Sequence, residues 1–190
     1  MNILHIDSSI TGDQSASREL TRAIVETLTA EQADASVIYR DLAADPLDHI
    51  TLPAFAEEGS AQALAQFKAA DVVVIGAPMY NFTIPSQLKA WIDRILVAGG
   101  TFRYTANGVE GLSGDKRVII AIARGGFYGE GSAQESFEFV ERYLTATFAF
   151  IGVPNVEFVI AEGLKVSDDA RGAAMDGAVD RISTLTQLAA

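Results

Sequence analysis

Short apolar runs alternate with longer segments of helical periodicity along the whole chain. The clearest run lies within residues 71–76, where residues 72–75 are all valine or isoleucine, as in central parallel strands that are buried on both faces. Residues 17–30 show the other pattern, with apolar side chains every four residues on one helical face. The alternation predicts a succession of strand–helix units.

Five such units can be recognised, and with right-handed crossovers they predict a doubly wound α/β fold. The sheet should be parallel, with helices on both faces, in a single domain spanning residues 1–190. The predicted strands are residues 2–6, 36–39, 71–76, 117–123 and 156–160. The predicted helices are residues 17–30, 61–70, 85–98, 134–150 and 168–188, and residues 46–59 are predicted to form a loop.

The order of the strands indicates where a ligand would bind. Doubly wound sheets of five parallel strands commonly have the order 2-1-3-4-5, so we expect that order here. The direction of winding then reverses between strands 1 and 3, and ligands bind in the crevice outside the carboxyl ends of such strands. Residues 8–17 and 77–83 follow these two strands and should flank a ligand.

Composition and charge narrow the class of protein. The chain is 49% hydrophobic and 21% charged, which is ordinary for a globular domain. It contains no cysteine, which excludes a disulfide framework and thiol catalysis, and no apolar run is long enough for a membrane helix. The amino end reads as a strand and not as a signal peptide, so we expect a cytoplasmic protein. A net charge of −11 opposes binding to nucleic acid or to an anionic membrane.

The segment after the first predicted strand is rich in hydroxyl side chains. Residues 7–17 contain no lysine or arginine, and neither the Walker motif nor the dinucleotide GxGxxG motif is present. Free N–H groups at a helix start can bind an anion with help from the helix dipole, and Ser9, Ser15 and Ser17 could add hydroxyl donors. This predicts a phosphate site that uses no lysine. Ordinary capping of the following helix is the alternative interpretation.

The segment after the third predicted strand places Tyr80-Asn81-Phe82 between two prolines. Two aromatic rings in such a loop would expose apolar surface unless they cover something, and a planar ring system suits that role. Asn81 offers both a donor and an acceptor to the edge of a ring with C=O and N–H groups. Packing of the two aromatic rings on the core is the alternative.

These motifs bring a specific resemblance. Pro78-Met79-Tyr80-Asn81-Phe82 and the following residues 84–89 resemble the FMN-dependent NADH-azoreductase family, also described as NADH:quinone reductases. Residues 100–105, the Ser15-Ala16-Ser17 loop and the Arg124-Gly125-Gly126 turn resemble the same family. The resemblance covers the chain from end to end and implies a flavodoxin-like fold.

The resemblance also implies which residues bind FMN. The phosphate would lie in the first loop, the isoalloxazine ring would lie along the third, and the turn after the fourth strand would contact the flavin edge. The family often has serine where this chain has Ala123, so the resemblance does not carry over the hydroxyl contact at this position. The implied residues are Ser9, Ser15, Ala16, Ser17, Pro78, Met79, Tyr80, Asn81, Phe82, Ala123, Arg124, Gly125 and Gly126.

The resemblance also implies an enzyme in which FMN carries the chemistry. NADH would reduce the flavin, and a quinone or an azo compound would then take two electrons at the same face, which implies ping-pong kinetics. The family is homodimeric, with the site near the interface; residues 127–128 and 148–150 are candidates for that interface or for the core. No side chain is assigned as a catalytic acid or base, no metal site is expected, and His5 and His49 are assigned structural or surface roles.

Two other functions share this fold. A non-enzymatic electron carrier of flavodoxin type would bind the same FMN and would also be acidic. A bacterial receiver domain would place a phosphoacceptor aspartate at the end of the third strand, where this chain has Gly76-Ala77. The receiver interpretation is therefore disfavoured, and the carrier is the main alternative to the enzyme.

Overall fold

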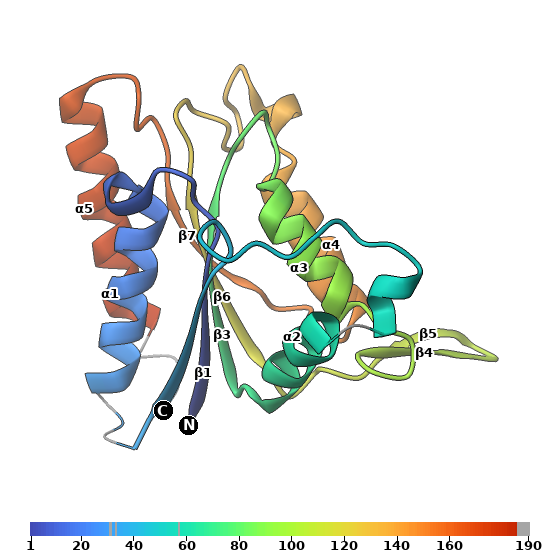
Figure 1. The fold of residues 1–190 in the computed structure, drawn as a ribbon. Helices are drawn as coiled ribbons and strands as arrows, with labels where there is room; N and C mark the ends of the chain where they lie inside the picture. The colour runs from blue at the N-terminus through green and yellow to red at the C-terminus, as the bar shows by residue number, and fades with distance from the viewer. Residues whose placement is uncertain (31, 33, 57, 186–190) are drawn as a thin grey trace.

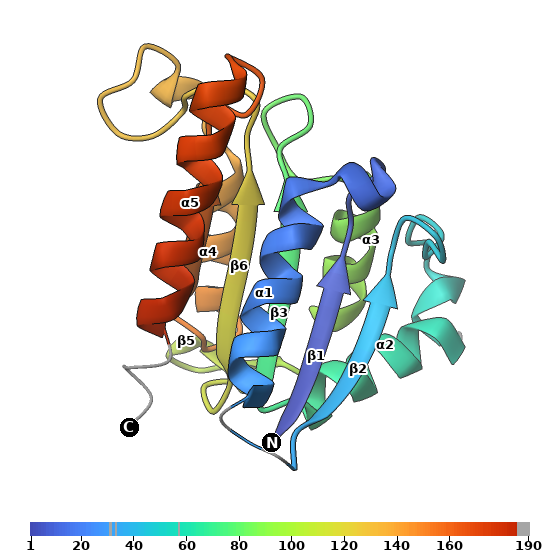
Figure 2. The same cartoon turned by 90° about the vertical axis from the view of Figure 1, so that its left-hand side faces the viewer.

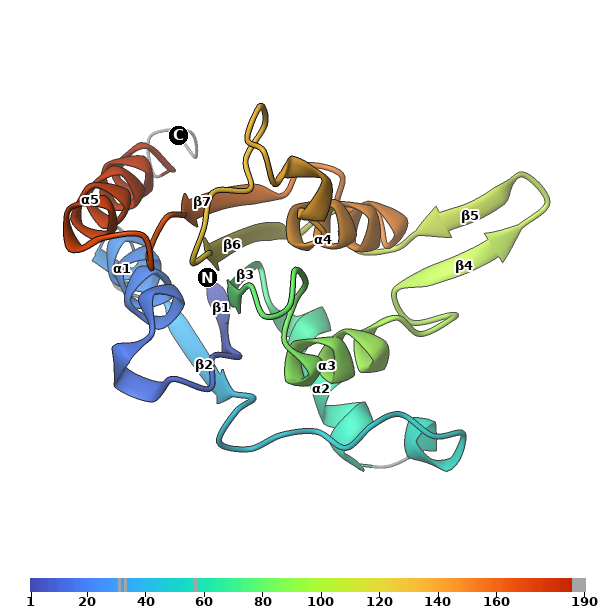
Figure 3. The ribbon, with the colours of Figure 1, turned by 90° about the horizontal axis from the view of Figure 1, so that it is seen from above.

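The computed structural model describes residues 1–30, 32, 34–56 and 58–185. A parallel sheet lies in the middle of the molecule with helices on both faces (Figures 1 and 3). Within the described residues the main sheet has five strands in the order β2-β1-β3-β6-β7. Numbered within the sheet alone, this is the predicted order 2-1-3-4-5. The strands are β1 (Asn2–Asp7), β2 (Ser36–Asp41), β3 (Val72–Pro78), β6 (Arg117–Ala123) and β7 (Glu157–Ala161).

The centre of the sheet is its most apolar part. Every residue of β3 is buried, and so are residues 118–122 of β6, because helices cover both faces of these strands. At the edge, β2 leaves Val37 and Ile38 partly exposed. The predicted strand positions are confirmed, with ends that differ by at most two residues.

In the described part of the chain, two helices cover one face of the sheet and three cover the other (Figures 2 and 3). On the first face, α1 and α5 pack against each other around Leu20, Ile24 and Ile182. On the second face, Phe67, Trp91 and other buried side chains of three helices form the larger part of the core. The helices are α1 (Ala16–Ala30), α2 (Glu58–Ala69), α3 (Ser86–Ile95), α4 (Val140–Phe150) and α5 (Asp168–Leu185). Residues 186–188 of the last predicted helix lie outside the described residues.

The prediction of one long helix over residues 134–150 is wrong. The segment forms a short 3₁₀ turn, Glu135–Phe137, and a separate helix α4 that begins at Val140. The break occurs at Glu138, whose carboxylate accepts hydrogen bonds from the backbone N–H groups of Val140 and Glu141 at 2.9 and 3.0 Å. A side chain that caps the first turn in this way starts a new helix.

The end of α3, the start of α2 and the predicted loop before α2 also differ from the prediction. Helix α3 ends at Ile95 and not at residue 98, because Thr101 donates a hydrogen bond to the Ile95 carbonyl and the chain turns through Gly99 at a φ of +79°. The predicted loop at 46–59 contains a 3₁₀ turn, Pro53–Ala56. Helix α2 begins at Glu58, three residues earlier than predicted.

A hairpin between α3 and β6 was not predicted. Strands β4 (Phe102–Thr105) and β5 (Gly108–Gly111) pair antiparallel and project from the body of the molecule (Figure 3). Each strand has four residues, mostly exposed, so neither shows the apolar alternation that identifies a strand. Among the helices of the described residues, none combines the length and the apolarity needed to cross a bilayer.

Candidate functional site

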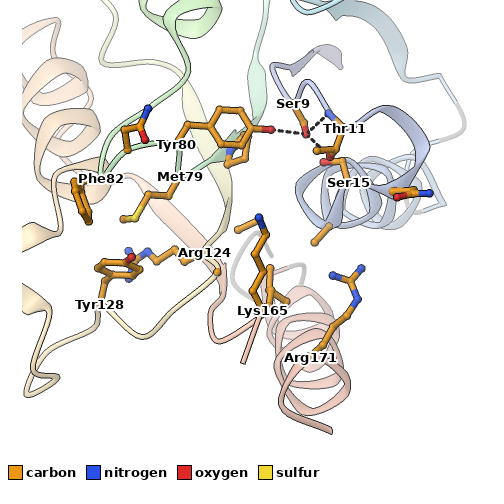
Figure 4. A pocket seen from close by; sticks show the side chains of 17 residues that line it. Ser9, Thr11, Ser15, Met79, Tyr80, Phe82, Arg124, Tyr128, Lys165 and Arg171 are labelled. Atoms are coloured by element: carbon orange, nitrogen blue, oxygen red, sulfur yellow. Dashed lines mark hydrogen bonds between the residues drawn. The ribbon is translucent and has the colours of Figure 1, made fainter. Parts of the chain in front are cut away.

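A cavity of about 420 Å³ lies at the carboxyl edge of the sheet, which is an ordinary size for a small-molecule site. It is bounded by the loops after β1, β3, β6 and β7 (Figure 4). Except for Ser17 and Gly126, all the residues that the family resemblance implied for FMN line it. These are Ser9, Ser15, Ala16, Pro78, Met79, Tyr80, Asn81, Phe82, Ala123, Arg124 and Gly125. The strand order thus brings the predicted loops together at the expected crevice.

Hydroxyl groups line the β1 side of the cavity. The Ser9 hydroxyl lies 3.0 Å from the Thr11 hydroxyl, and the Ser15 hydroxyl lies 3.1 Å from that of Ser17. Ser15 also caps α1, since its hydroxyl accepts a hydrogen bond from the Arg18 N–H at 3.3 Å. The N–H groups of Ala16 and Ser17 have no acceptor within the helix, because they lie in its first turn. Capping and an anion-binding arrangement therefore coexist in this loop.

The two predicted loops are joined directly. The Tyr80 hydroxyl lies 3.1 Å from the Ser9 hydroxyl and accepts a hydrogen bond from the Ile10 N–H at 3.2 Å (Figure 4). This contact links the loop after β1 to the loop after β3 across the switch point of the sheet. Tyr80 therefore fixes the distance between the hydroxyl-rich wall and the aromatic wall.

The turn at residues 80–83 is strained. Backbone hydrogen bonds connect Tyr80 and Thr83 in both directions, at 2.9 and 3.2 Å. Between them, Asn81 has a φ of +47° and Phe82 a φ of +74°, which are unfavourable for side chains other than glycine. A conformation of this kind costs on the order of 1–3 kcal/mol and is concentrated at functional sites. It presents both side chains to the cavity and does not bury them.

The aromatic rings of this loop are not tucked onto the core. Phe82 is 44% exposed and lies 5.1 Å, centroid to centroid, from Phe137, which is also half exposed. Tyr128 packs edge-on against Phe82 at 6.3 Å and lines the cavity. The three rings form an aromatic shelf of which Phe82 and Tyr128 line the cavity and Phe137 packs beside Phe82, and the interpretation of Phe82 as core is wrong.

Arg124 is buried beneath the cavity wall and does not offer a free charge. Its guanidinium group forms ion pairs with Glu138 and Glu162, both at 3.3 Å, and with Glu141. Glu162 in turn accepts hydrogen bonds from the N–H groups of Tyr128 and Gly129 at 3.0 and 3.1 Å. Arg124 thus holds the loop of residues 125–139 in place, and its side chain faces these carboxylates.

The two glycines after Arg124 have different surroundings. A Cβ atom at Gly125 would lie 3.3 Å from the side chain of Lys165, which crosses over this position. A Cβ at Gly126 would lie 3.3 Å from both Tyr128 and Gln134, and Gly126 is not among the residues that line the cavity. Packing of protein side chains therefore explains Gly126, and only Gly125 lines the cavity.

Six residues on the cavity wall had no place in the sequence-based site. Most important are Lys165, in the loop after β7, and Arg171, in the first turn of α5, because they bring positive charge to the cavity (Figure 4). The carboxyl end of every parallel strand lies at this edge, so the position of Lys165 just after a strand was the available signal. The other four are Thr11, Gln14, Tyr128 and Leu164.

A partly buried polar network supports the loop after β1. Asp7 accepts hydrogen bonds from the hydroxyls of Thr21 at 2.9 Å and Tyr39 at 3.1 Å. Arg18 forms a bidentate pair with Asp41 at 2.7 Å and donates to the Ser9 carbonyl at 2.8 Å. Its guanidinium group lowers the pKa of Asp41. The network therefore connects β1, α1 and β2 to the backbone of Ser9.

Gly76 makes room for this network. A Cβ at position 76 would lie 2.6 Å from a carboxylate oxygen of Asp7, so the buried aspartate occupies the space of a side chain. His5 is buried on β1, the strand of Asp7, with its Nε2 atom 3.4 Å from Asp7. It does not line the cavity. The described residues contain no cluster of three or more His, Asp or Glu side chains able to hold a metal ion.

Titration of Tyr39 should report on the network. Partial burial, together with the negative charge of Asp7, raises the pKa of Tyr39 to about 12. Because this pKa is raised above that of the unfolded chain, its stabilising contribution is complete below about pH 10 and is lost as the pH rises toward 12. We expect the phenolate difference spectrum between the wild type and Tyr39→Phe to have its midpoint near pH 12. A midpoint near 10 would contradict the hydrogen bond to Asp7.

Comparison with known proteins extends over nearly the whole chain. A family model described as a flavodoxin-like fold matches residues 1–185. The FMN-dependent NADH:quinone oxidoreductase 2 of Bradyrhizobium diazoefficiens is 51% identical, over 97% of this chain and 98% of that protein. The FMN-dependent NADH:quinone oxidoreductase of Methylocella silvestris is 50% identical, with the same shares covered.

Solved structures show the same similarity. The azoreductase from Bacillus anthracis strain Sterne superimposes with a TM-score of 0.88 and 27% identity, over 97% of this chain and 98% of that one. An FMN-dependent NADH-azoreductase from the Ames Ancestor strain, in complex with FMN, has a TM-score of 0.84 and 27% identity, over 97% and 99%. The chain therefore belongs to the flavodoxin-like family and, within it, to the enzymes named FMN-dependent NADH:quinone oxidoreductases.

Proposed function

We propose that this protein binds FMN in the cavity and uses NADH to reduce quinones and to cleave azo compounds. The observation that carries the proposal is the meeting of a hydroxyl-rich helix start and an exposed aromatic turn in one cavity, joined by Ser9 and Tyr80. The relatives that the chain matches are named for FMN, NADH and quinone, and the similar structures for azo compounds. Because these proteins are named as oxidoreductases and azoreductases, an enzyme is favoured over a non-enzymatic electron carrier.

The residues of the cavity fit a phosphorylated planar cofactor. Ser9, Ser15 and the first N–H groups of α1 would hold the phosphate, as helix starts do for anions. Tyr80 and Phe82 would lie along the ring, and Asn81 would offer a donor and an acceptor to its edge. When bound, FMN supplies the transfer of a hydride and of electron pairs, and the protein supplies position and charge.

The chain's own residues would then orient the reactants. The aromatic shelf of Phe82, Tyr128 and Phe137 would place a planar nicotinamide or quinone by stacking and would exclude water from that side. One open cavity would serve NADH and the acceptor in turn, which gives ping-pong kinetics. No described side chain on the wall is assigned as an acid or base.

The experiment that tests the proposal is anaerobic stopped-flow spectroscopy. The purified protein should be yellow, NADH should bleach the flavin band, and a quinone or an azo dye should restore it. Initial rates at several fixed acceptor concentrations should give parallel double-reciprocal lines. A flavin band that NADH leaves unchanged would favour the electron carrier.

Replacement of Tyr80 by phenylalanine should weaken FMN binding about threefold to tenfold, because it removes one neutral hydrogen-bonding hydroxyl from the link to Ser9. The measurement is quenching of flavin fluorescence on titration of the flavin-free protein. Tyr104→Phe is the matched control, since Tyr104 lies on the exposed hairpin and is 73% exposed. Equal affinities of the two variants would show that the link does not matter for binding.

A homodimer is also proposed, with half-exposed aromatic residues at its interface. Phe127 and Phe150 are 49% and 38% exposed, whereas Phe148 is fully buried and belongs to the core. Light scattering after size exclusion should give twice the mass of 20.2 kDa. Cytoplasmic location stays a prediction, which cell fractionation would test.

A further inference from the structure

The cavity is positively charged, although the chain carries a net charge of −11. The charged residues that line it are Arg124, Lys165 and Arg171, and no aspartate or glutamate is among its lining residues. A local cluster of one sign raises the concentration of ligands of the opposite sign, even against the field of the whole protein. The cavity is therefore suited to an anionic ligand.

Two of the three cations have no partner among the residues that the structure describes. Arg124 is neutralised by Glu138, Glu141 and Glu162. The side chains of Lys165 and Arg171, in contrast, form no ion pair or hydrogen bond with any residue that the structure describes. Their charge remains available to a ligand.

The positions of Lys165 and Arg171 place that charge opposite the hydroxyl groups. Helices α1 and α5 pack side by side, and both begin at the carboxyl edge of the sheet (Figure 2). Ser15 directly precedes α1, and Arg171 lies in the first turn of α5. Figure 4 shows Arg171 and Lys165 directed into the cavity from the α5 side, with Ser9 and Ser15 on the α1 side.

The backbone that carries these two cations is held firmly. The Lys165 N–H donates to the Gly125 carbonyl at 2.9 Å, and the Leu164 N–H donates to the Arg124 carbonyl at 3.1 Å. At the start of α5, the Ser167 hydroxyl accepts a hydrogen bond from the Ala170 N–H at 3.1 Å. Binding therefore has to order only the two side chains and not the backbone, which limits its entropic cost.

We infer that Arg171 and Lys165 supply the ionic part of FMN recognition, by binding the phosphate ester from the side opposite Ser9 and Ser15. A guanidinium group can donate two parallel hydrogen bonds to phosphate, and an ammonium group adds a point charge. This inference rests on the proposed function and revises the prediction of a phosphate site that uses no lysine. It makes charge the basis on which this chain distinguishes FMN from riboflavin.

The test compares FMN and riboflavin binding to flavin-free protein, measured by fluorescence quenching. Arg171→Ala should weaken FMN binding about tenfold or more, the size of a lost charge-assisted hydrogen bond, and should leave riboflavin binding unchanged. Lys165→Ala should also weaken the binding of FMN and not that of riboflavin, with a smaller loss of FMN affinity than Arg171→Ala. Raising the salt concentration from about 0.05 M to about 0.5 M should weaken FMN binding more in the wild type than in the double variant.

Arg181→Ala and Lys68→Ala are the matched controls. Arg181 lies on the same helix, Lys68 lies on α2, and neither lines the cavity, so both should retain wild-type affinity for FMN. Equal losses for FMN and riboflavin, or FMN affinity unchanged in both cavity variants, would overturn the assignment while the proposed function stands. If NADH turnover with an acidic acceptor falls while FMN affinity is unchanged, the cations serve the acceptor and the assignment is likewise wrong. Wild-type protein that binds no flavin would contradict the proposed function itself, and this inference with it.

Discussion

Replacement of Arg124 by methionine should lower the free energy of unfolding by about 3–5 kcal/mol, the usual cost of removing one partner from a buried ion cluster. The guanidinium group is 1% exposed and is shared by three carboxylates. Methionine fills part of the volume but leaves Glu138, Glu141 and Glu162 without their cation. Urea unfolding of the flavin-free protein, followed by circular dichroism, measures the loss.

Arg103→Met provides the matched control for this change. Arg103 also forms a bidentate pair, with Glu110 at 2.8 Å, but on the exposed hairpin. Surface pairs of this kind contribute little, so its replacement should leave the unfolding curve nearly unchanged. Arg124→Lys keeps the charge and should lose less than Arg124→Met. Similar losses for Arg103→Met and Arg124→Met would mean that the buried cluster contributes no more than a surface pair.

Replacement of Gly111 by alanine is expected to destabilise the protein by about 1–3 kcal/mol or more, as overpacking does. The added Cβ atom would overlap backbone atoms of Ile151 and Gly152, where the hairpin meets the end of α4. Backbone cannot give way as a flexible side chain can, so β5 must move away from α4. The measurement is the midpoint of thermal unfolding, with the urea curve as a second probe.

Gly177→Ala makes the same chemical change where nothing lies within 4 Å of the new atom. Gly177 is inside α5, so alanine should raise the free energy of unfolding by about 0.5–1 kcal/mol. The two substitutions are thus expected to have opposite signs. A Gly111→Ala variant as stable as the wild type would show that the hairpin does not dock against α4 in solution. The Gly111→Ala variant should bind FMN with unchanged affinity, because Gly111 does not line the cavity.

Local patterns were enough to predict the sheet and the two loops that meet at its switch point. Residues 72–75 had to be central because they are apolar on both faces, and only helices on both sides could bury them. The hydroxyls around Ser9 and the aromatic turn around Tyr80 each followed directly from a strand end. Since the carboxyl ends of parallel strands share one edge, strand order alone brought them together.

Other features depend on residues that are distant in the sequence. The break in the predicted helix at 134–150 follows from Glu138, which is drawn to Arg124, and from its capping of α4. Neither residue indicates this alone, because the direction of a side chain at a strand end is set by the elements packed around it. The hairpin at 102–111 was missed for a related reason, since its short strands are held by docking and not by an apolar pattern.

The charge of the cavity shows most clearly the difference between what the sequence predicts and what tertiary packing decides. From the sequence, a net charge of −11 and a first loop without lysine or arginine pointed to a phosphate site of hydroxyls and amides only. That loop is where it was expected, because hydroxyl side chains before a helix are a local signal. Lys165 and Arg171 follow a different strand. They line this cavity because the loop after β7 is hydrogen-bonded to the turn after β6 and because α5 packs beside α1. The chemistry of a single loop can be predicted from neighbouring residues in the sequence. The sign of the electrostatic field in a cavity is the sum over side chains that only tertiary packing brings together.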